Sequence, residues 1–154
     1  MMKSFGDLFD QPNDLDSKQE FFFRFGCITF LAVQSRLRQR QPMAYIDRII
    51  LPALKHEQVK IFYDYRGSPV GFVVWAFLSD LVERRFLEDG AWNLHESEWN
   101  EGSNLWIIDV GAPKTSLRKV LRTAIRSLPT GIPVIKYARQ RQGLLICFEY
   151  ERQE

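Results

Sequence analysis

The stretch NLWIIDVGAP (residues 104–113) decides the fold. Its apolar run from Leu105 to Ile108 predicts a buried β-strand. Asp109 follows the run directly and lies next to Gly111, where the backbone can be approached closely. Burial disfavours a charged carboxylate unless a cation or hydrogen-bond donors compensate. Two interpretations therefore stay open: Asp109 is a functional residue, or it is a strand-end residue bonded to loop amides.

A long helix is predicted near the start of the chain. Ser17 and Glu20 have the spacing of a capping box, in which the serine accepts from the backbone and the glutamate reaches back. The run KQEFFFRFGCITFLAVQSRL (18–37) is apolar on most faces, which predicts a helix buried on two sides. Pro42 predicts that this helix does not continue past residue 41.

A second helix is predicted over residues 42–58, because Pro42 suits a first helical turn. The apolar positions of this segment fall on one stripe, formed by Met43, Ile46, Ile49, Ile50, Ala53 and Leu54. Pro52 lies within the stripe and removes a backbone donor. We therefore expect a kink or an early end near Leu51.

A hairpin and a helix follow. The β-rich runs 59–65 and 69–78 are separated by a glycine-containing turn, which is typical of adjacent antiparallel strands. Residues 79–89 then predict a helix, capped by Ser79 or Asp80.

The second half of the chain predicts a loop over 90–103, a helix over 115–129, and strands over 132–138 and 144–150. The inward residues expected for this helix are Leu117, Val120, Leu121, Ala124, Ile125 and Leu128. Together with the earlier elements, this order predicts a mixed α/β or α+β layer fold.

The composition predicts one domain. The chain has 154 residues, 45% of them hydrophobic and 14% aromatic, so we expect a flexible arm over 1–15 and one domain over 16–154. Cys27 and Cys147 lie in apolar runs, which predicts two buried thiols of a reducing compartment. Neither a secretory signal nor a membrane-spanning apolar run is evident, so a cytoplasmic protein is expected.

The net charge of +2 argues against a general nucleic-acid binder. Two basic clusters nevertheless stand out, namely Arg36, Arg38 and Arg40, and Arg118, Lys119, Arg122 and Arg126. Each is either a solvated helix face or a local patch for an acidic protein or a phosphate. His56 and His95 lack metal-ligand spacing, and no glycine-rich phosphate loop is present, so we expect no bound metal or cofactor.

Three motifs carry a resemblance to a known family. YIDRIILPAL resembles a helix that ends in L-P-A-I, SPVGFVVWAFLS resembles P-V-A-Y-C-S-W-A, and LWIIDVGAP resembles W-I-I-D-W-I-A-P. With these motifs, the chain resembles the toxin-activating lysine acyltransferases from about Gly26 to Pro113. Those bacterial cytoplasmic enzymes attach a fatty acyl group to internal lysines of a repeat-in-toxin protoxin.

The resemblance implies a fold similar to the GNAT-type acetyltransferases, with a twisted mixed sheet flanked by helices. It also implies an acyl-loaded acyl carrier protein as the donor, a protein substrate with a target lysine, and a possible homodimer. Carrier proteins are acidic, so the basic helix faces suit them as docking surfaces.

The resemblance also implies the catalytic residues. The family pairs a histidine, which follows the first long helix in the motif S-x-x-H, with the aspartate of W-I-I-D. In this chain Asp109 and Ser35 match that pattern, but Arg38 stands at the histidine position. An arginine stays protonated and cannot act as a base. It can pair with Asp109 or, with Ser35, stabilise a thioester oxygen.

Three functions follow as alternatives. The first is a lysine acyltransferase of the toxin-activating type, with Asp109, Arg38 and Ser35 in the site. The second is a catalytically impaired relative that binds a carrier, a lipid or a partner protein. The third is a nucleic-acid module, which rests only on the arginine clusters and would lose affinity steeply with salt.

Overall fold

The computed structural model describes residues 16–34, 42–89, 94–142 and 144–153. The expected arm over 1–15 lies outside the described residues. The helices are α1 (Ser17–Val33), α3 (Pro42–Tyr45), η1 (Ile46–Ile50), α4 (Leu51–Lys55), α5 (Asp80–Asp89), η2 (Glu96–Trp99) and α6 (Leu117–Ser127). The strands are β1 (Val59–Tyr63), β2 (Pro69–Leu78), β3 (Asn104–Gly111), β4 (Val134–Arg141) and β5 (Leu144–Glu151).

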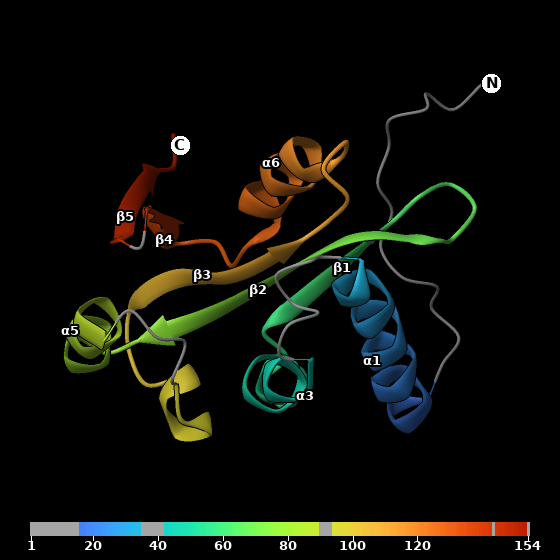
Figure 1. Cartoon of the computed structure of the whole chain (residues 1–154), viewed down its shortest axis with the longest axis horizontal. Coiled ribbons are helices and arrows are strands. Elements are labelled where there is room, and N and C mark those ends of the chain that lie inside the picture. The colour runs from blue at the N-terminus through green and yellow to red at the C-terminus, as the bar shows by residue number, and fades with distance from the viewer. Residues whose placement is uncertain (1–15, 35–41, 90–93, 143, 154) are drawn as a thin grey trace.

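The strands form one sheet in the order β1-β2-β3-β4-β5 (Figure 1). β1, β2 and β3 are antiparallel neighbours, β4 runs parallel to β3, and β5 returns antiparallel to β4. Parallel neighbours need a crossover connection, and α6 supplies it. The predicted α/β (α+β) class, with its mixed sheet flanked by helices, is confirmed and is consistent with a GNAT-like fold.

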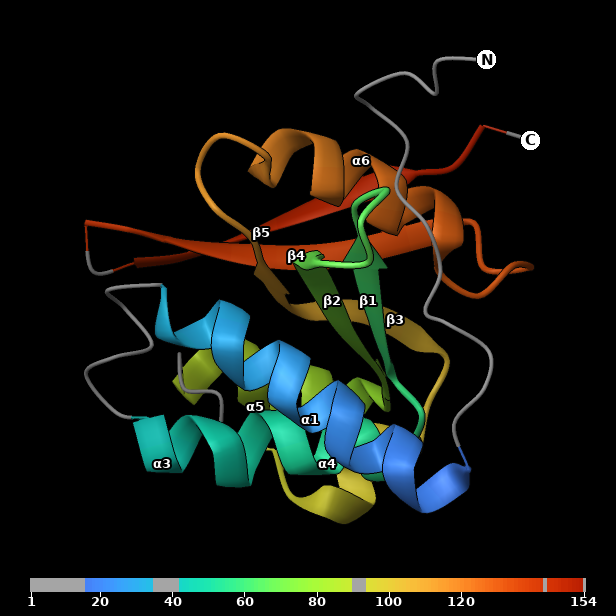
Figure 2. The same cartoon turned by 90° about the vertical axis from the view of Figure 1, so that its right-hand side faces the viewer.

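The sheet separates two apolar cores (Figure 2). One face, here called the α1 face, is covered by α1 and by the helical segment α3–η1–α4; its core includes Ile28, Ile50, Val74, Trp106 and Ile108. The other, the α6 face, is covered by α6; its core includes Val73, Trp75, Leu105, Ile107 and Val120. Successive strand residues alternate between the two faces, as a sheet with helices on both sides requires.

The start of α1 differs from the prediction. Asp16, and not Ser17, is the N-cap, because its Oδ1 accepts from the backbone N–H groups of Lys18 at 3.0 Å and Gln19 at 2.8 Å. An aspartate accepts these bonds as well as a serine does, and its charge suits the positive end of the helix dipole. The capping box predicted at Ser17 is therefore wrong by one residue.

α1 is buried on one side, so the predicted burial on two sides is also wrong. Its buried residues are Arg24, Cys27, Ile28, Leu31 and Ala32, which share one face at helical spacing. Phe22 and Phe30 are 61% and 57% exposed on the outer side. Among the described helices, none combines the length and the apolar character needed to cross a bilayer.

The second helix passes through Pro52 and reaches Lys55. The irregularity predicted near Leu51 takes the form of the π-helical turn Ile46–Ile50, in which the N–H of Leu51 bonds to the carbonyl of Ile46. A proline cannot bond to the carbonyl four residues earlier, and its ring crowds that carbonyl. The wider turn provides the space, so the helix does not end early.

The inward face of α6 is narrower than predicted. Val120, Ala124 and Leu128 are buried on the α6 face, as expected. Leu121 and Ile125 are partly buried against the same core. Leu117 is 40% exposed, so its predicted burial is wrong. It is the first residue of the helix.

The two cysteines have different surroundings. Cys27 is buried on α1, as predicted, and burial raises the pKa of its thiol. Cys147 is exposed, so its predicted burial is wrong. β5 is the outermost strand of the sheet, and side chains on both of its faces reach the surface. An apolar run on an edge strand therefore did not indicate burial.

Two glycines predict opposite effects of alanine on stability. A Cβ at Gly111 would lie 2.0 Å from a ring atom of Phe72, so Gly111→Ala should destabilise the fold by about 1–3 kcal/mol. A Cβ at Gly26, within α1, would meet no atom within 4 Å. Gly26→Ala should stabilise the fold by about 0.5–1 kcal/mol, because alanine favours helices. Urea unfolding of both variants checks the signs, and equal signs would contradict this packing.

Candidate functional site

Asp109 is half-buried near the end of β3, and its carboxylate accepts hydrogen bonds from a side chain and from the backbone. The hydroxyl of Tyr45, on α3, donates to its Oδ2. The backbone N–H of Val110 donates to its Oδ1 at 2.8 Å. Both partners are donors, so each carboxylate oxygen has a hydrogen bond from the protein. These bonds also fix the direction in which the carboxylate points.

A β-bulge lies immediately before Asp109. In the pairing of β2 with β3, Trp75 lies opposite Ile107 and Val74 lies opposite Asp109. Ile108 is therefore an extra residue of β3 with no counterpart on β2. Bulges of this kind bend a strand and change the direction of the side chains that follow.

The bulge decides which face Asp109 occupies. Ile107 packs on the α6 face and Ile108 on the α1 face, as regular alternation requires. Without the bulge, Asp109 would turn back toward α6. It instead contacts Tyr45 on the α1 face, and Val110 packs on the α6 face. The extra residue thus places the carboxylate of Asp109 on the α1 face of the sheet.

Tyr45 was not identified from the sequence. It is the last residue of α3, and the π turn begins at the next residue. Its contact with Asp109 spans 64 positions in the chain. In the sequence it stands beside an apolar stripe and begins the motif YIDRIILPAL, but neither signal connected its hydroxyl with the strand. The π turn that accommodates Pro52 therefore begins directly after Tyr45, the residue that donates to Asp109.

Strands β3 and β4 pair over three residues only, from Leu105 opposite Ile135 to Ile107 opposite Tyr137. β4 then continues to Arg141 with β5 as its partner, while β3 continues to Gly111 with β2 as its partner. In Figure 2, β4 and β5 run across the view, whereas β1 and β2 run steeply. Asp109 lies two residues after Ile107, the last residue of β3 that pairs with β4.

Two of the three predicted site residues, Ser35 and Arg38, lie outside the described residues. α1, which precedes them, and α3, which follows them, both belong to the α1 face of the sheet. That is the face on which Asp109 meets Tyr45. The roles expected for Ser35 and Arg38 stay predictions from the sequence.

The hydrogen bonds described for the two histidines are with η2 and not with Asp109. The Nε2 atom of His56 lies 2.9 Å from the backbone oxygen of Glu96. His95 is the N-cap of η2, where its backbone N–H donates to Glu98 at 2.9 Å. His56 thus links the end of α4 to η2, whereas His95 caps η2 itself. Within the described ranges, no three His, Cys, Asp or Glu side chains gather as a metal site would require.

A second charged cluster lies between α5 and the sheet. The Nζ of Lys136, on β4, lies 2.7 Å and 3.0 Å from the two carboxylate oxygens of Glu83. The indole N–H of Trp106 donates to Glu83 at 2.8 Å, and Asn104 accepts from Lys136 at 3.3 Å. Both carboxylate oxygens of Glu83 have donors, so this cluster joins α5 to β3 and β4 and is structural.

Comparison with known proteins gives one consistent family. The family model described as the RTX toxin acyltransferase family matches residues 17–143. This region contains both Asp109 and Tyr45, as well as the stretch with Ser35 and Arg38.

Three relatives illustrate the similarity. An uncharacterized protein of Synechocystis is 33% identical over 89 residues, 57% of this chain and 60% of the relative. The leukotoxin-activating lysine-acyltransferase of Mannheimia haemolytica serotype A1 is 33% identical over 95 residues, 62% and 56% of the two chains. The lysine-acyltransferase of Vibrio cholerae is 30% identical over 96 residues, 62% of each. The matched part is thus less than two thirds of each relative.

Proposed function

Since the chain belongs to the RTX toxin acyltransferase family, we propose that it transfers a fatty acyl group to a lysine of a protein substrate. The donor is an acyl-loaded acyl carrier protein, and the acceptor is the ε-amino group of an internal lysine. The observation that carries this proposal is the position of the Asp109 carboxylate. The β-bulge turns it to the α1 face of the sheet, where the hydroxyl of Tyr45 donates to it.

The reaction explains the need for a carboxylate. The lysine nitrogen attacks the thioester carbonyl and the new C–N bond forms. The C–S bond then breaks, and the carrier's sulfur leaves as a thiol after taking the second proton of the lysine nitrogen. A lysine ammonium must first lose a proton to become a nucleophile. Asp109 orients that ammonium and accepts its proton or passes it to water. Tyr45 keeps the carboxylate in place through its hydroxyl.

The roles of Arg38 and Ser35 are proposed from the sequence. Arg38 stands where the family's histidine is expected, and it stays protonated at all relevant pH values. It cannot remove the lysine proton, so in this chain that task falls to Asp109. Arg38 and Ser35 instead donate to the thioester oxygen as negative charge develops on it.

We place the reaction in the bacterial cytoplasm, where acyl carrier proteins load their fatty acids, and expect the chain to act as a homodimer. Light scattering during gel filtration measures the mass in solution. A monomeric mass at micromolar concentration would remove the dimer from the proposal and leave the chemistry unchanged.

A second candidate function rests on Arg38. With an arginine in place of a histidine base, the protein would bind an acyl carrier, a lipid or a partner without turnover. Arg38→His separates the two functions. If the parent is inert and the variant transfers an acyl group, the binding function is favoured, whereas transfer by the parent excludes it.

The direct test is acyl transfer itself. The protein is incubated with a bacterial acyl carrier protein loaded with acyl chains of several lengths and with a repeat-in-toxin protoxin. The expected result is a mass gain of one acyl group on a lysine of the protoxin. Equal gains for the parent and for Asp109→Ala would show that this site is not catalytic.

A further inference from the structure

The segment between β3 and β4 has an unusual charge distribution. Residues 112–133 contain no aspartate or glutamate. They contain five basic residues, Lys114, Arg118, Lys119, Arg122 and Arg126. All five are exposed. Since the whole chain has a net charge of only +2, this positive charge is concentrated on one element. We call these five residues the α6 basic surface.

The α6 basic surface has no acidic partner within the described part of the protein. Some basic side chains elsewhere have one: Arg24 lies 2.9 Å from Glu57, and Lys55 lies 3.0 Å from Glu96. The ion pairs of the described residues include none of the five residues of this surface. Its charges are therefore available to an acidic molecule.

Helix stability does not account for the charges at the start of α6. Arg118 and Lys119 occupy the first turn of α6, next to the positive end of the helix dipole, where cations are unfavourable. The helix has no acidic residue with which they could pair four positions away. Arg126, in the last turn, suits the dipole, but Arg118 and Lys119 work against their own helix, which points to a requirement outside it.

The α6 basic surface begins close to the proposed site. α6 starts at Leu117, shortly after β3 ends at Gly111, and it leads to β4. It therefore joins the two strands that part beside Asp109. α6 lies on the opposite side of the sheet from α1 and α3 (Figure 1). Leu117, 40% exposed, adds an apolar contact among the charges.

We propose that the α6 basic surface is the docking surface for the acyl carrier protein. The inference rests on the proposed function, which it extends by locating the donor. Acyl carrier proteins are small and acidic, so their charge complements this helix. A carrier bound here approaches from the α6 face, and its flexible prosthetic arm enters where β3 and β4 part. The lysine substrate then reaches Asp109 from the α1 face.

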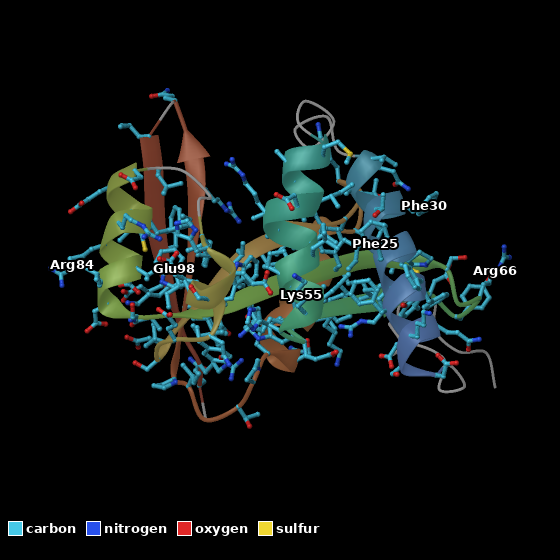
Figure 3. All side chains as sticks on the ribbon, turned by 90° about the horizontal axis from the view of Figure 1, so that it is seen from below. Phe25, Phe30, Lys55, Arg66, Arg84 and Glu98 are labelled. Atoms are coloured by element: carbon cyan, nitrogen blue, oxygen red, sulfur yellow. The ribbon has the colours of Figure 1, made fainter. Side chains whose placement is uncertain are left out.

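Charge reversal on α6 tests this proposal. The variant carries Arg118→Glu and Arg122→Glu, and the control carries Arg84→Glu on α5. Arg84 is exposed and points away from the body of the protein (Figure 3). A glutamate in the first turn of α6 suits the helix dipole, so the variant should fold. Thermal unfolding verifies this for both proteins.

The expected result is a KM for the acyl carrier at least about tenfold higher in the α6 variant, with kcat nearly unchanged. The difference should shrink at high salt, because salt screens exposed charges. Transfer from a small acyl-pantetheine thioester, which has no carrier protein attached, should be equal in all three proteins. Arg84→Glu should match the parent in every assay.

Three outcomes would contradict the proposed docking surface. They are an unchanged KM for the carrier, an equal loss with acyl-pantetheine, or a rise in KM for the protein substrate alone. Binding of the carrier without an acyl group is measured separately by calorimetry. It must weaken in the α6 variant even if no protein transfers an acyl group. Absence of transfer by the parent would thus reject the proposed function, while calorimetry still decides the docking surface.

Discussion

Replacing Asp109 by asparagine should lower the rate of acyl transfer by about 10²- to 10⁴-fold, the usual contribution of a general base. Asparagine has nearly the same size and keeps an oxygen that can accept from Tyr45. It lacks the negative charge that attracts the lysine ammonium and takes its proton. The measurement is a single-turnover rate with saturating acyl carrier, so that binding and product release do not contribute.

The control for this variant is Asp47→Asn. Asp47 is exposed on η1, two positions from Tyr45, and should leave the rate unchanged. Both variants should unfold at the temperature of the parent within a few degrees. If Asp109→Asn kept half of the parental rate or more, the carboxylate would have no part in the chemistry.

The largest effect on stability is expected at Glu83. Breaking a buried ion pair by removing one partner costs about 3–5 kcal/mol. The side chains of Lys136 and Glu83 are 19% and 18% exposed, which places Glu83→Ala at about the low end of that range. The same change removes the acceptor of the Trp106 indole N–H. The free energy of unfolding in urea is the measurement.

Two further variants show whether the cost comes from the unpaired charge. Glu88→Ala, on the exposed side of α5, should change stability by less than about 0.5 kcal/mol. Glu83→Leu combined with Lys136→Met should recover much of the loss, because the part-buried, unpaired cation is then gone. A loss at Glu88 as large as that at Glu83 would mean that α5 itself, and not the ion pair, determines stability.

The elements that the sequence predicted well are those with strong local signals. The hairpin of β1 and β2 has two β-rich runs around a short turn, and α6 has an apolar stripe of helical period. The errors lie at positions where two local solutions compete. Asp16 and Ser17 both suit an N-cap. Pro52 is compatible either with a helix end or with a π turn before it.

The candidate site could be predicted only in part. Asp109 was identified because a carboxylate interrupts an apolar run, which is a local signal. Its partner Tyr45 is distant in the sequence and belongs to another element. The bulge at Ile108 was also not predictable, because no residue type or spacing in this strand marks the position of an extra residue. Contacts that depend on the register between elements require the structure.

The central claim is that Tyr45 acts through Asp109, and a double-mutant cycle tests it most directly. The cycle compares single-turnover rates of Tyr45→Phe, Asp109→Asn and the double variant. Tyr45→Phe alone should lower the rate by about tenfold, because an unheld carboxylate is misaligned. Once Asp109 is replaced by asparagine, the tyrosine has no carboxylate left to orient, so the double variant should be as fast as Asp109→Asn alone. A double variant slower by the product of both single effects would contradict the account.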